Sequence, residues 1–400
     1  MGLFSAFNGL SHALFQLLGG PAGSYCRLET ADDPLTLVAD DGSLIGAVGV
    51  SGSLALASEE DLEAISETLA EKTRSLFDRP GHALSMVFDH DPGGAGREIA
   101  ENLRPSRVSA GECSLALGGV LDGWEASLAQ TTGSESLTLV LWTRPTLLAD
   151  LARREAIRET MAGLGKPTKG RQTEGRAVAA LRSAHRAARE LLLGALVSAG
   201  LLGRVLTAKE ICRLMRLALD PNLTGEDFAP LLPGDPRPYL LPDPGGDPQS
   251  SLLYPSLASQ IFPGEAKVVD RSMVLVGQRL HAPFLMAVPP RTPRPFSELR
   301  RALAAGRPQD PLRTLVALSP DGLSGKSLQS ALASILGFSS ADNKALVSAL
   351  AGLKRMSERG EIVAGLSMAF DTYVDLAEHG RLPEAAKALR GRLARLARVV

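Results

Sequence analysis

The residues best suited to chemistry are Gly325, Lys326 and Ser327, which resemble the end of a phosphate-binding loop. They follow an apolar run at residues 314–318 that is typical of a buried strand. A complete loop has a glycine five residues before Gly325, because closely spaced backbone N–H groups wrap the phosphates. Pro320 occupies that position and has no N–H to donate. We interpret the stretch as a strand-to-helix turn, with nucleotide binding by Gly325, Lys326 and Ser327 as the alternative.

A second cluster, Asp89-His90-Asp91, combines residue types that serve as metal ligands or as acid–base groups. It precedes a Pro-Gly-Gly sequence at residues 92–94, and no second histidine–carboxylate motif joins it, so a solvated turn is favoured. The cysteines at positions 26, 113 and 212 stand singly, without metal-ligand or disulfide spacing. The sequence therefore predicts no metal site and no catalytic residue, and its cysteine usage favours a reducing compartment.

Composition limits the class of protein further. The 400 residues are 44% hydrophobic, which allows a sizeable core and excludes disorder for most of the chain. The formal net charge of −1 gives no overall electrostatic footprint for nucleic acid, which makes nucleic acid an unlikely partner. The longest uncharged apolar run covers residues 191–203, whereas a membrane-spanning helix needs about 20 residues. No segment is therefore expected to span a membrane.

Residues 1–25 are predicted to form an amphipathic N-terminal helix. Its apolar side chains recur at helical spacing with almost no charge opposite them, and the first basic residue is Arg27. The helix therefore lacks the charged start of a secretory signal. With no Lys or Arg to attract anionic lipid, packing against protein is favoured over contact with a membrane surface. The residues expected to make the partner or membrane contact are Leu3, Phe4, Phe7, Leu10 and Leu14.

The elements that would position these residues begin with an α+β layer at residues 26–146. Two β-rich runs within 35–50 flank Asp40-Asp41-Gly42, which is typical of a hairpin. The pattern then predicts a helix from Ser58 to about Phe77, a strand at 83–88, a short helix at 97–103 and a strand at 137–142.

The second half repeats this order. Strands are predicted at residues 268–276 and 280–288, a helix at 296–304, a strand at 312–318 and a helix at 328–336, which together form a second layer at 263–340. Between the layers, 147–222 is predicted to be a helical hairpin with a mobile basic tip at 163–170, followed by a Pro-rich loop at 223–262. Residues 341–400 are predicted to be helical.

The predicted fold class is therefore α+β, with two ββαβα layers of ferredoxin-like or related type. The helical hairpin is inserted between the two layers, and a helical segment ends the chain.

Three groups of residues carry a resemblance to a known family. They are the Asp40-Asp41-Gly42-Ser43 hairpin leading to residues 48–50, the stretch from 206–211 to 219–222, and the stretch from 269–272 through 285–290 to 295–296. Across residues 28–340 the chain resembles the N-terminal region of the cytoplasmic motor ATPases of type IV secretion and conjugation systems. The similarity is greatest to the TraU/IcmB (DotO)-like branch of type IVB systems.

This resemblance implies a non-catalytic region that precedes a RecA-like ATPase domain beyond residue 400. That domain would bind ATP and Mg²⁺ and energise substrate translocation or conjugative DNA transfer, whereas this chain would need no cofactor. The region would mediate docking to inner-membrane subunits of the secretion system and oligomerisation into a ring. Its partners would be its own copies, the ATPase domain and those subunits, and it would be cytoplasmic and peripheral at the bacterial inner membrane.

Overall fold

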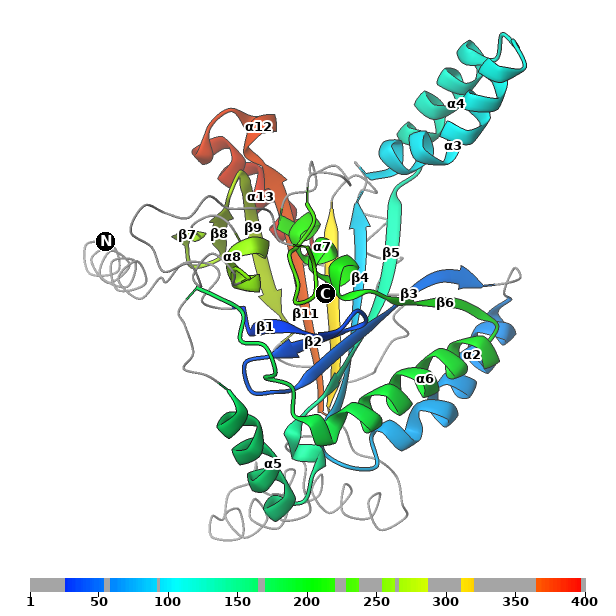
Figure 1. Cartoon of the computed structure of the whole chain (residues 1–400). Helices are drawn as coiled ribbons and strands as arrows, with labels where there is room; N and C mark the ends of the chain where they lie inside the picture. Colours follow the sequence, from blue (N-terminus) through cyan, green and yellow to red (C-terminus); the bar gives the residue numbers. More distant parts are fainter. Residues whose placement is uncertain are drawn as a thin grey trace, which may run out of the picture.

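The computed structural model describes residues 26–53, 58–91, 94–164, 170–219, 228–236, 254–262, 266–286, 311–319 and 365–396. These residues form a mixed α/β structure built on one large antiparallel sheet (Figure 1). The strands are β1 (Leu28–Asp33), β2 (Thr36–Ala39), β3 (Leu44–Ser53), β4 (His82–Asp91), β5 (Ser134–Thr143), β6 (Leu201–Leu206), β7 (Ala266–Asp270), β8 (Met273–Val276), β9 (Arg279–Leu285), β10 (Leu312–Ser319) and β11 (Gly365–Asp375).

The strands from the two halves of the chain belong to the same sheet. Their order is β1-β2-β3-β5-β4-β10-β11-β9-β8-β7, and β6 pairs with β3 beside β2. The halves meet where β4 pairs with β10 along residues 84–90 and 312–318. The two predicted layers are therefore joined through backbone hydrogen bonds into one sheet rather than lying as two separate sheets.

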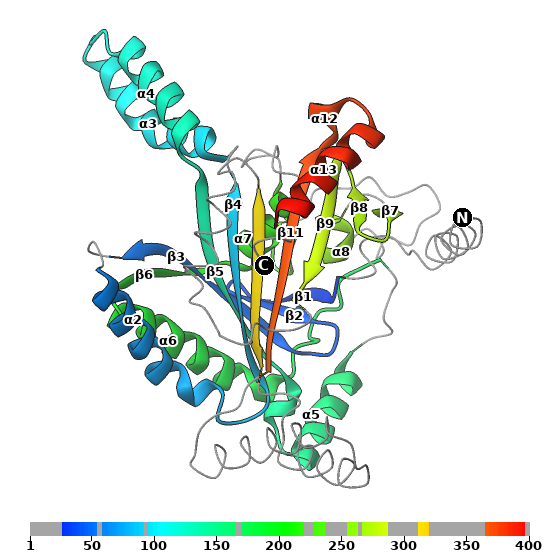
Figure 2. The same ribbon diagram turned by 180° about the vertical axis from the view of Figure 1, so that it is seen from behind.

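The helices cover this sheet unequally. They are α2 (Glu59–Thr73), α3 (Gly94–Glu112), α4 (Gly118–Thr131), α5 (Asp150–Gly163), α6 (Arg182–Ser198), α7 (Ala208–Leu219), α8 (Leu257–Ile261), α12 (Leu376–His379) and α13 (Leu382–Leu396). The 3-10 turns are η2 (Arg74–Leu76), η3 (Pro145–Leu147) and η4 (Ala179–Leu181). Figure 2 shows α2 and α6 side by side below the sheet and α13 against its other end.

The core follows the alternation of side chains along β3. Leu192 and Leu196 of α6 pack with Val48 on one face, together with Leu84 of β4. Residues of opposite parity, such as Ala47, face α7 and α8 on the other side. Near the C-terminal part of the described chain, α13 packs against β9 and β11. The first half of β3, residues 44–48, is therefore buried on both faces and is central to the fold.

Most elements of the first predicted layer are present. The strands around Asp40-Asp41-Gly42, the helix after Ser58 and the strands at 83–88 and 137–142 all appear. Ser58 accepts a hydrogen bond from the Asp61 N–H and the Asp61 carboxylate accepts one from the Ser58 N–H, which caps α2. The short helix at 97–103 is instead the longer α3, which continues through Pro105 and is followed by α4.

The predicted helical hairpin at 147–222 is wrong in two respects. Helix α6 packs against α2 and the sheet, and α5 lies apart from it (Figure 1). Residues 201–206 form strand β6 rather than helix. Gly200 has a φ of +71°, a conformation that ends helices, and Thr207 and Glu210 cap the start of α7. The six residues between them complete the sheet beside β3. Most of the predicted basic tip, 165–169, lies outside the described residues.

The helical prediction for 341–400 is also wrong over residues 365–375, which form β11 between β10 and β9. In this strand Phe370, Thr372, Tyr373 and Val374 are buried, whereas Asp371 and Asp375 are only partly buried. The helices α12 and α13 follow as predicted. The helices predicted at 296–304 and 328–336 lie outside the described residues.

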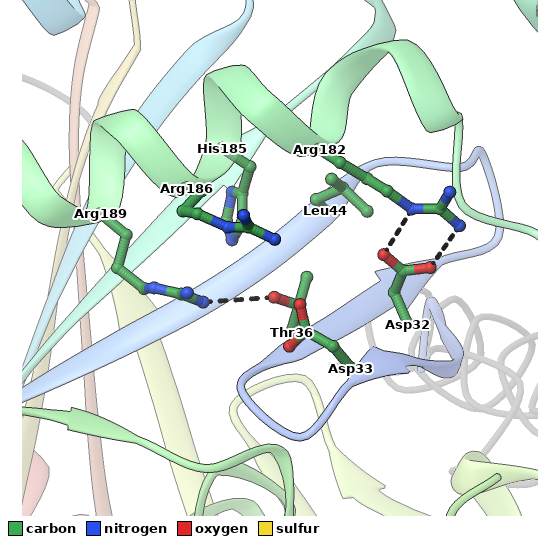
Figure 3. Close-up of a pocket in the computed structure, with 8 residues that line it drawn as sticks. All are labelled: Asp32, Asp33, Thr36, Leu44, Arg182, His185, Arg186 and Arg189. Carbon is green, nitrogen blue, oxygen red and sulfur yellow. Dashed lines mark hydrogen bonds and ion pairs between the residues drawn. The ribbon is translucent and has the colours of Figure 1, made fainter. Parts of the chain in front are cut away.

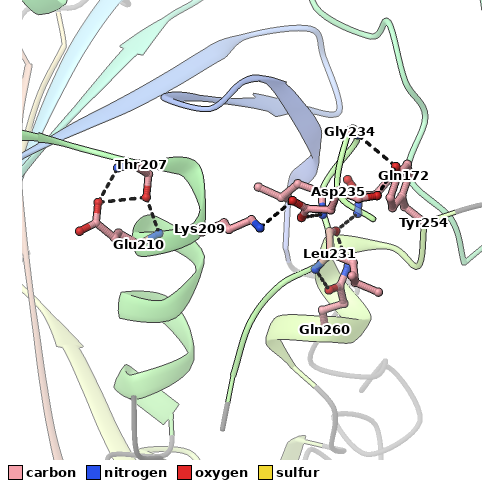
Figure 4. Close-up of polar contacts among 10 residues, drawn as sticks. Gln172, Thr207, Lys209, Glu210, Leu231, Gly234, Asp235, Tyr254 and Gln260 are labelled. Atoms are coloured by element: carbon pink, nitrogen blue, oxygen red, sulfur yellow. Dashed lines mark hydrogen bonds and ion pairs between the residues drawn. The ribbon is translucent and has the colours of Figure 1, made fainter. Parts of the chain in front are cut away.

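The ends of the predicted Pro-rich loop at 223–262 are anchored to the first half of the chain. Gln172 Nε2 donates hydrogen bonds to the Leu231 and Pro255 carbonyls, at 2.7 and 2.9 Å (Figure 4). Lys209 Nζ lies 2.6 Å from Asp235 Oδ1. Leu232, Leu257 and Ile261 are buried in the same cluster as Leu37 and Ile45. Residues 228–236 and 254–262 therefore belong to the fold, whereas 237–253 lie outside the described residues.

Candidate functional site

The part of the described structure best suited to recognition is the helical hairpin formed by α3 and α4. It is inserted between the antiparallel strands β4 and β5 and projects from the end of the sheet (Figures 1 and 2). Ala110 and Leu121 are buried within it. Its two helices pack mainly on each other, so most of their outer surface faces away from the sheet.

An ion-pair network holds the two helices together. Arg107 Nη1 lies 2.5 Å from Asp122 Oδ1, and Arg107 Nη2 lies 2.6 Å from Glu125 Oε2. The hydrogen bond to Asp122 is the main reason that the pKa of the Arg107 guanidinium is raised above its usual value. The two ion pairs link α3 to α4 through one arginine side chain. The hairpin thus keeps its shape without covering its outer face.

That outer face is apolar. Trp124 is 58% exposed, and Val120 and Leu128 beside it are also exposed, so three large side chains follow one stripe of α4. Val108 of α3 and the connecting residues Leu115 and Leu117 extend the exposed set. Large exposed apolar patches commonly mark sites of interaction with another protein or with a membrane. We call these six residues the hairpin face.

Small residues beside this stripe leave room for close approach. A methyl group added at Gly119 or Gly123 would meet no other described atom within 4 Å outside its own helix backbone. Glycines at this spacing let a second helix come near the backbone of α4. Together with Trp124, they make a surface with both a large anchoring side chain and open space around it. Tryptophan in such a setting commonly dominates binding energy.

The described residues also include three free cysteines, Cys26, Cys113 and Cys212. No group of three His, Cys, Asp or Glu side chains within the described ranges is arranged to hold a metal ion. Burial raises the pKa of the Cys212 thiol to about 12, so it stays protonated at neutral pH and is a poor nucleophile. Cys113 is exposed at the end of α3.

The structure places the Asp89-His90-Asp91 cluster in strand β4, not in a turn. Asp89 Oδ1 lies 2.5 Å from Arg313 Nε of β10, and His90 Nδ1 lies 3.2 Å from Glu135 Oε1 of β5. Neighbouring side chains of a strand point to opposite faces, so His90 and the two aspartates are not brought to one point. The predicted solvated turn is therefore wrong, because Asp89, His90 and Asp91 pair with β10 and β5 as part of the sheet.

The other residues singled out from the sequence lie outside the described residues. They are Gly325, Lys326 and Ser327 of the incomplete phosphate-binding loop and Leu3, Phe4, Phe7, Leu10 and Leu14 of the N-terminal segment. The hairpin face is not among the residues predicted from the sequence. The apolar spacing of Leu117, Val120, Leu121, Trp124 and Leu128 was visible and could have indicated α4.

Comparisons with known proteins add no identification, because no protein-family model and no curated protein matches the chain. Within the described part of the chain, every helix is too short or too polar to cross a membrane.

Proposed function

We propose that this chain is a non-catalytic interaction and oligomerisation region of a type IV secretion or conjugation motor ATPase. The observation that carries the proposal is the hairpin face, an exposed apolar surface around Trp124 on a projecting pair of helices. Such a surface is expensive to leave in water, since each Å² of apolar area removed from water contributes roughly 25 cal/mol. A role in assembly explains why the chain carries it.

The sequence resemblance supports the choice of a secretion-system assembly in this proposal. In this proposal the region docks the motor to inner-membrane subunits of the secretion system and joins its own copies in a ring. A RecA-like domain bearing the working phosphate-binding loop binds ATP and Mg²⁺ and energises translocation or DNA transfer. The protein is cytoplasmic and peripheral at the bacterial inner membrane, with the N-terminal segment providing a further partner or lipid contact.

The fold-level part of the proposal is that each half derives from a ββαβα unit of ferredoxin-like or related type. Pairing of β4 with β10 supports this, because it lets two such units share one sheet. Joined in this way, the halves would act as one rigid platform for docking.

Sedimentation velocity over a wide range of protein concentration tests the proposal. The wild-type chain should self-associate reversibly, and a Trp124→Ser and Leu128→Ser double variant should weaken the association at least about tenfold. The matched control is Leu151→Ser on α5, which removes an equally apolar side chain that is 82% exposed. A wild-type chain that stays monomeric, or an equal effect of the control, would contradict this function.

Calorimetric titration with ATP and Mg²⁺ addresses the alternative of a self-contained nucleotide-binding protein. Because Pro320 cannot donate an N–H, we expect no saturable heat from the wild-type chain. Saturable binding that is lost in Lys326→Ala would favour the nucleotide-binding alternative instead.

A further inference from the structure

A pocket of about 230 Å³ lies between helix α6 and the hairpin formed by β1 and β2 (Figure 3). Helix α6 contributes Arg182, His185, Arg186 and Arg189, whose spacing of three, four and seven residues places them on one face of the helix. Asp32 and Asp33 line the opposite side. This volume exceeds the roughly 150 Å³ of an apolar cavity that holds benzene, so it admits a small ligand.

The carboxylates of both aspartates already accept hydrogen bonds from helix α6 or from the β1–β2 hairpin. Arg182 donates from Nε and Nη2 to the two carboxylate oxygens of Asp32, at 2.8 and 2.7 Å, in a bidentate pair. Asp33 Oδ1 accepts the Leu35 backbone N–H at 2.8 Å and holds the turn into β2. The Arg182–Asp32 pair therefore closes one wall of the pocket and leaves the other two arginines to face the remaining space.

Arg189 is the unusual member of this set, because it is only 8% exposed and has no anionic partner. Its Nη1 donates to Thr36 Oγ1 at 3.2 Å and to the Leu35 carbonyl at 3.3 Å, both neutral acceptors. Among the described residues, no carboxylate forms an ion pair with Arg189 or with Arg186. A buried guanidinium is costly unless a counter-charge meets it.

His185 does not supply a competing positive charge. It is 1% exposed, and its Nδ1 lies 2.9 Å from Thr143 Oγ1. Burial, with a smaller contribution from Arg189, lowers its pKa to about 4, so the ring is neutral at pH 7. Three arginines against two aspartates then leave the pocket with a net charge of +1. A ligand with one negative charge would balance it.

We infer that this pocket binds a small oxyanion of single negative charge, a carboxylate or a phosphodiester group, between Arg189 at its base and Arg186 at its rim. The planar guanidinium matches two oxygens that share one charge, and such charge-assisted hydrogen bonds are stronger than neutral ones. The remaining N–H groups of Arg189 are the donors not used by Thr36 and Leu35. Leu44 offers a small apolar wall for the carbon part of the ligand.

The test uses the full chain with ¹⁵N-labelled arginine, titrated with sodium acetate or dimethyl phosphate at constant ionic strength set with sodium chloride. We expect saturable shifts of the Arg189 Nε–Hε signal with a Kd of about 1 mM or weaker, because so few ligand atoms make contact. Saturation by acetate alone identifies a carboxylate ligand, and saturation by dimethyl phosphate alone identifies a phosphodiester. Saturation by neither anion overturns the inference.

Variants separate binding from a structural role. Arg189→Met keeps most of the side-chain length and should weaken anion binding at least tenfold without lowering the thermal midpoint, since it removes a buried charge. Arg186→Glu at the exposed rim should also weaken anion binding. This variant provides the test if Arg189→Met does not fold. Arg158→Gln on α5 is the matched control and should bind as the wild type does. Undiminished binding by either pocket variant would place the anion elsewhere and overturn the assignment.

Discussion

The helix pairs α2–α6 and α3–α4 use their apolar residues in opposite ways. Helix α2, which follows β3 and precedes β4 in the sequence, lies beside α6. Helix α6 buries Leu192 and Leu196 against the sheet. Helices α3 and α4, which connect β4 to β5 in the sequence, pack on each other and leave Trp124 and Leu128 exposed. The difference is position rather than composition. An apolar stripe stabilises the fold only where the sheet lies beneath it, and elsewhere it is available to a partner.

The largest expected effect is on the α2–α6 side of this comparison. Leu192 is 1% exposed and contacts the cluster that joins α6 to β3, β4 and β5. Leu192→Ala should lower the free energy of unfolding by about 2–5 kcal/mol, because the transfer energy is lost and a cavity is left. Chemical denaturation with a single transition measures it.

The control for Leu192→Ala lies on the same helix. Val197 is 62% exposed, so Val197→Ala should change stability by less than about 0.5 kcal/mol. Similar losses for the two variants would show that α6 is not packed on the sheet as described.

Acid should weaken the same side of the molecule through His185. Its folded pKa of about 4 lies below the ordinary value of 6.5, mainly because burial disfavours the charged ring. Above pH 6.5 both states are neutral and the stability is fully present. As pH falls from 6.5 to 4 the unfolded chain binds the proton first, so stability decreases by an amount on the order of 3 kcal/mol and levels off below pH 4.

Comparison with His185→Gln isolates this contribution. Arg189 on α6, His82 on β4, and Asp32 and Asp33 on β1 also act on the ring, and all four remain in the variant. The wild type should therefore lose stability relative to His185→Gln between pH 6.5 and 4. Parallel curves for the two proteins over that interval would contradict the buried neutral ring.

Local patterns predicted the strands of the first layer and helix α2, because hairpin residues, capping residues and alternation act over a few neighbours. Asp40-Asp41-Gly42 and Ser58 are of this kind. Contacts between distant residues could not be predicted in this way. Arg182 and Asp32 are separated by 150 positions, and β4 meets β10 across more than half of the chain. The pocket is formed by such distant residues. The hairpin face is defined by the exposure of its side chains, which a local pattern does not predict.

A smaller effect is expected at the start of α2. Ser58 Oγ accepts the Asp61 N–H at 3.2 Å and satisfies one of the free donors of the first turn. Ser58→Ala should therefore cost about 1 kcal/mol of folding free energy, measured by thermal or chemical denaturation. Ser109→Ala, in the exposed surface of α3, is the control and should be close to neutral. An equal response of both variants would mean that the cap does not stabilise α2.

The smallest effect on folding is expected for the most exposed aromatic side chain of the hairpin face. Trp124 is 58% exposed, so Trp124→Ala removes little buried area and should change the free energy of unfolding of the monomer by less than about 0.5 kcal/mol. Denaturation at low protein concentration, where association does not contribute, measures this value. A loss comparable with that of Leu192→Ala would mean that the hairpin face is covered within the chain, because only a buried tryptophan carries several kcal/mol. The distinction between a helix pair that stabilises the fold and one that recognises a partner would then no longer hold.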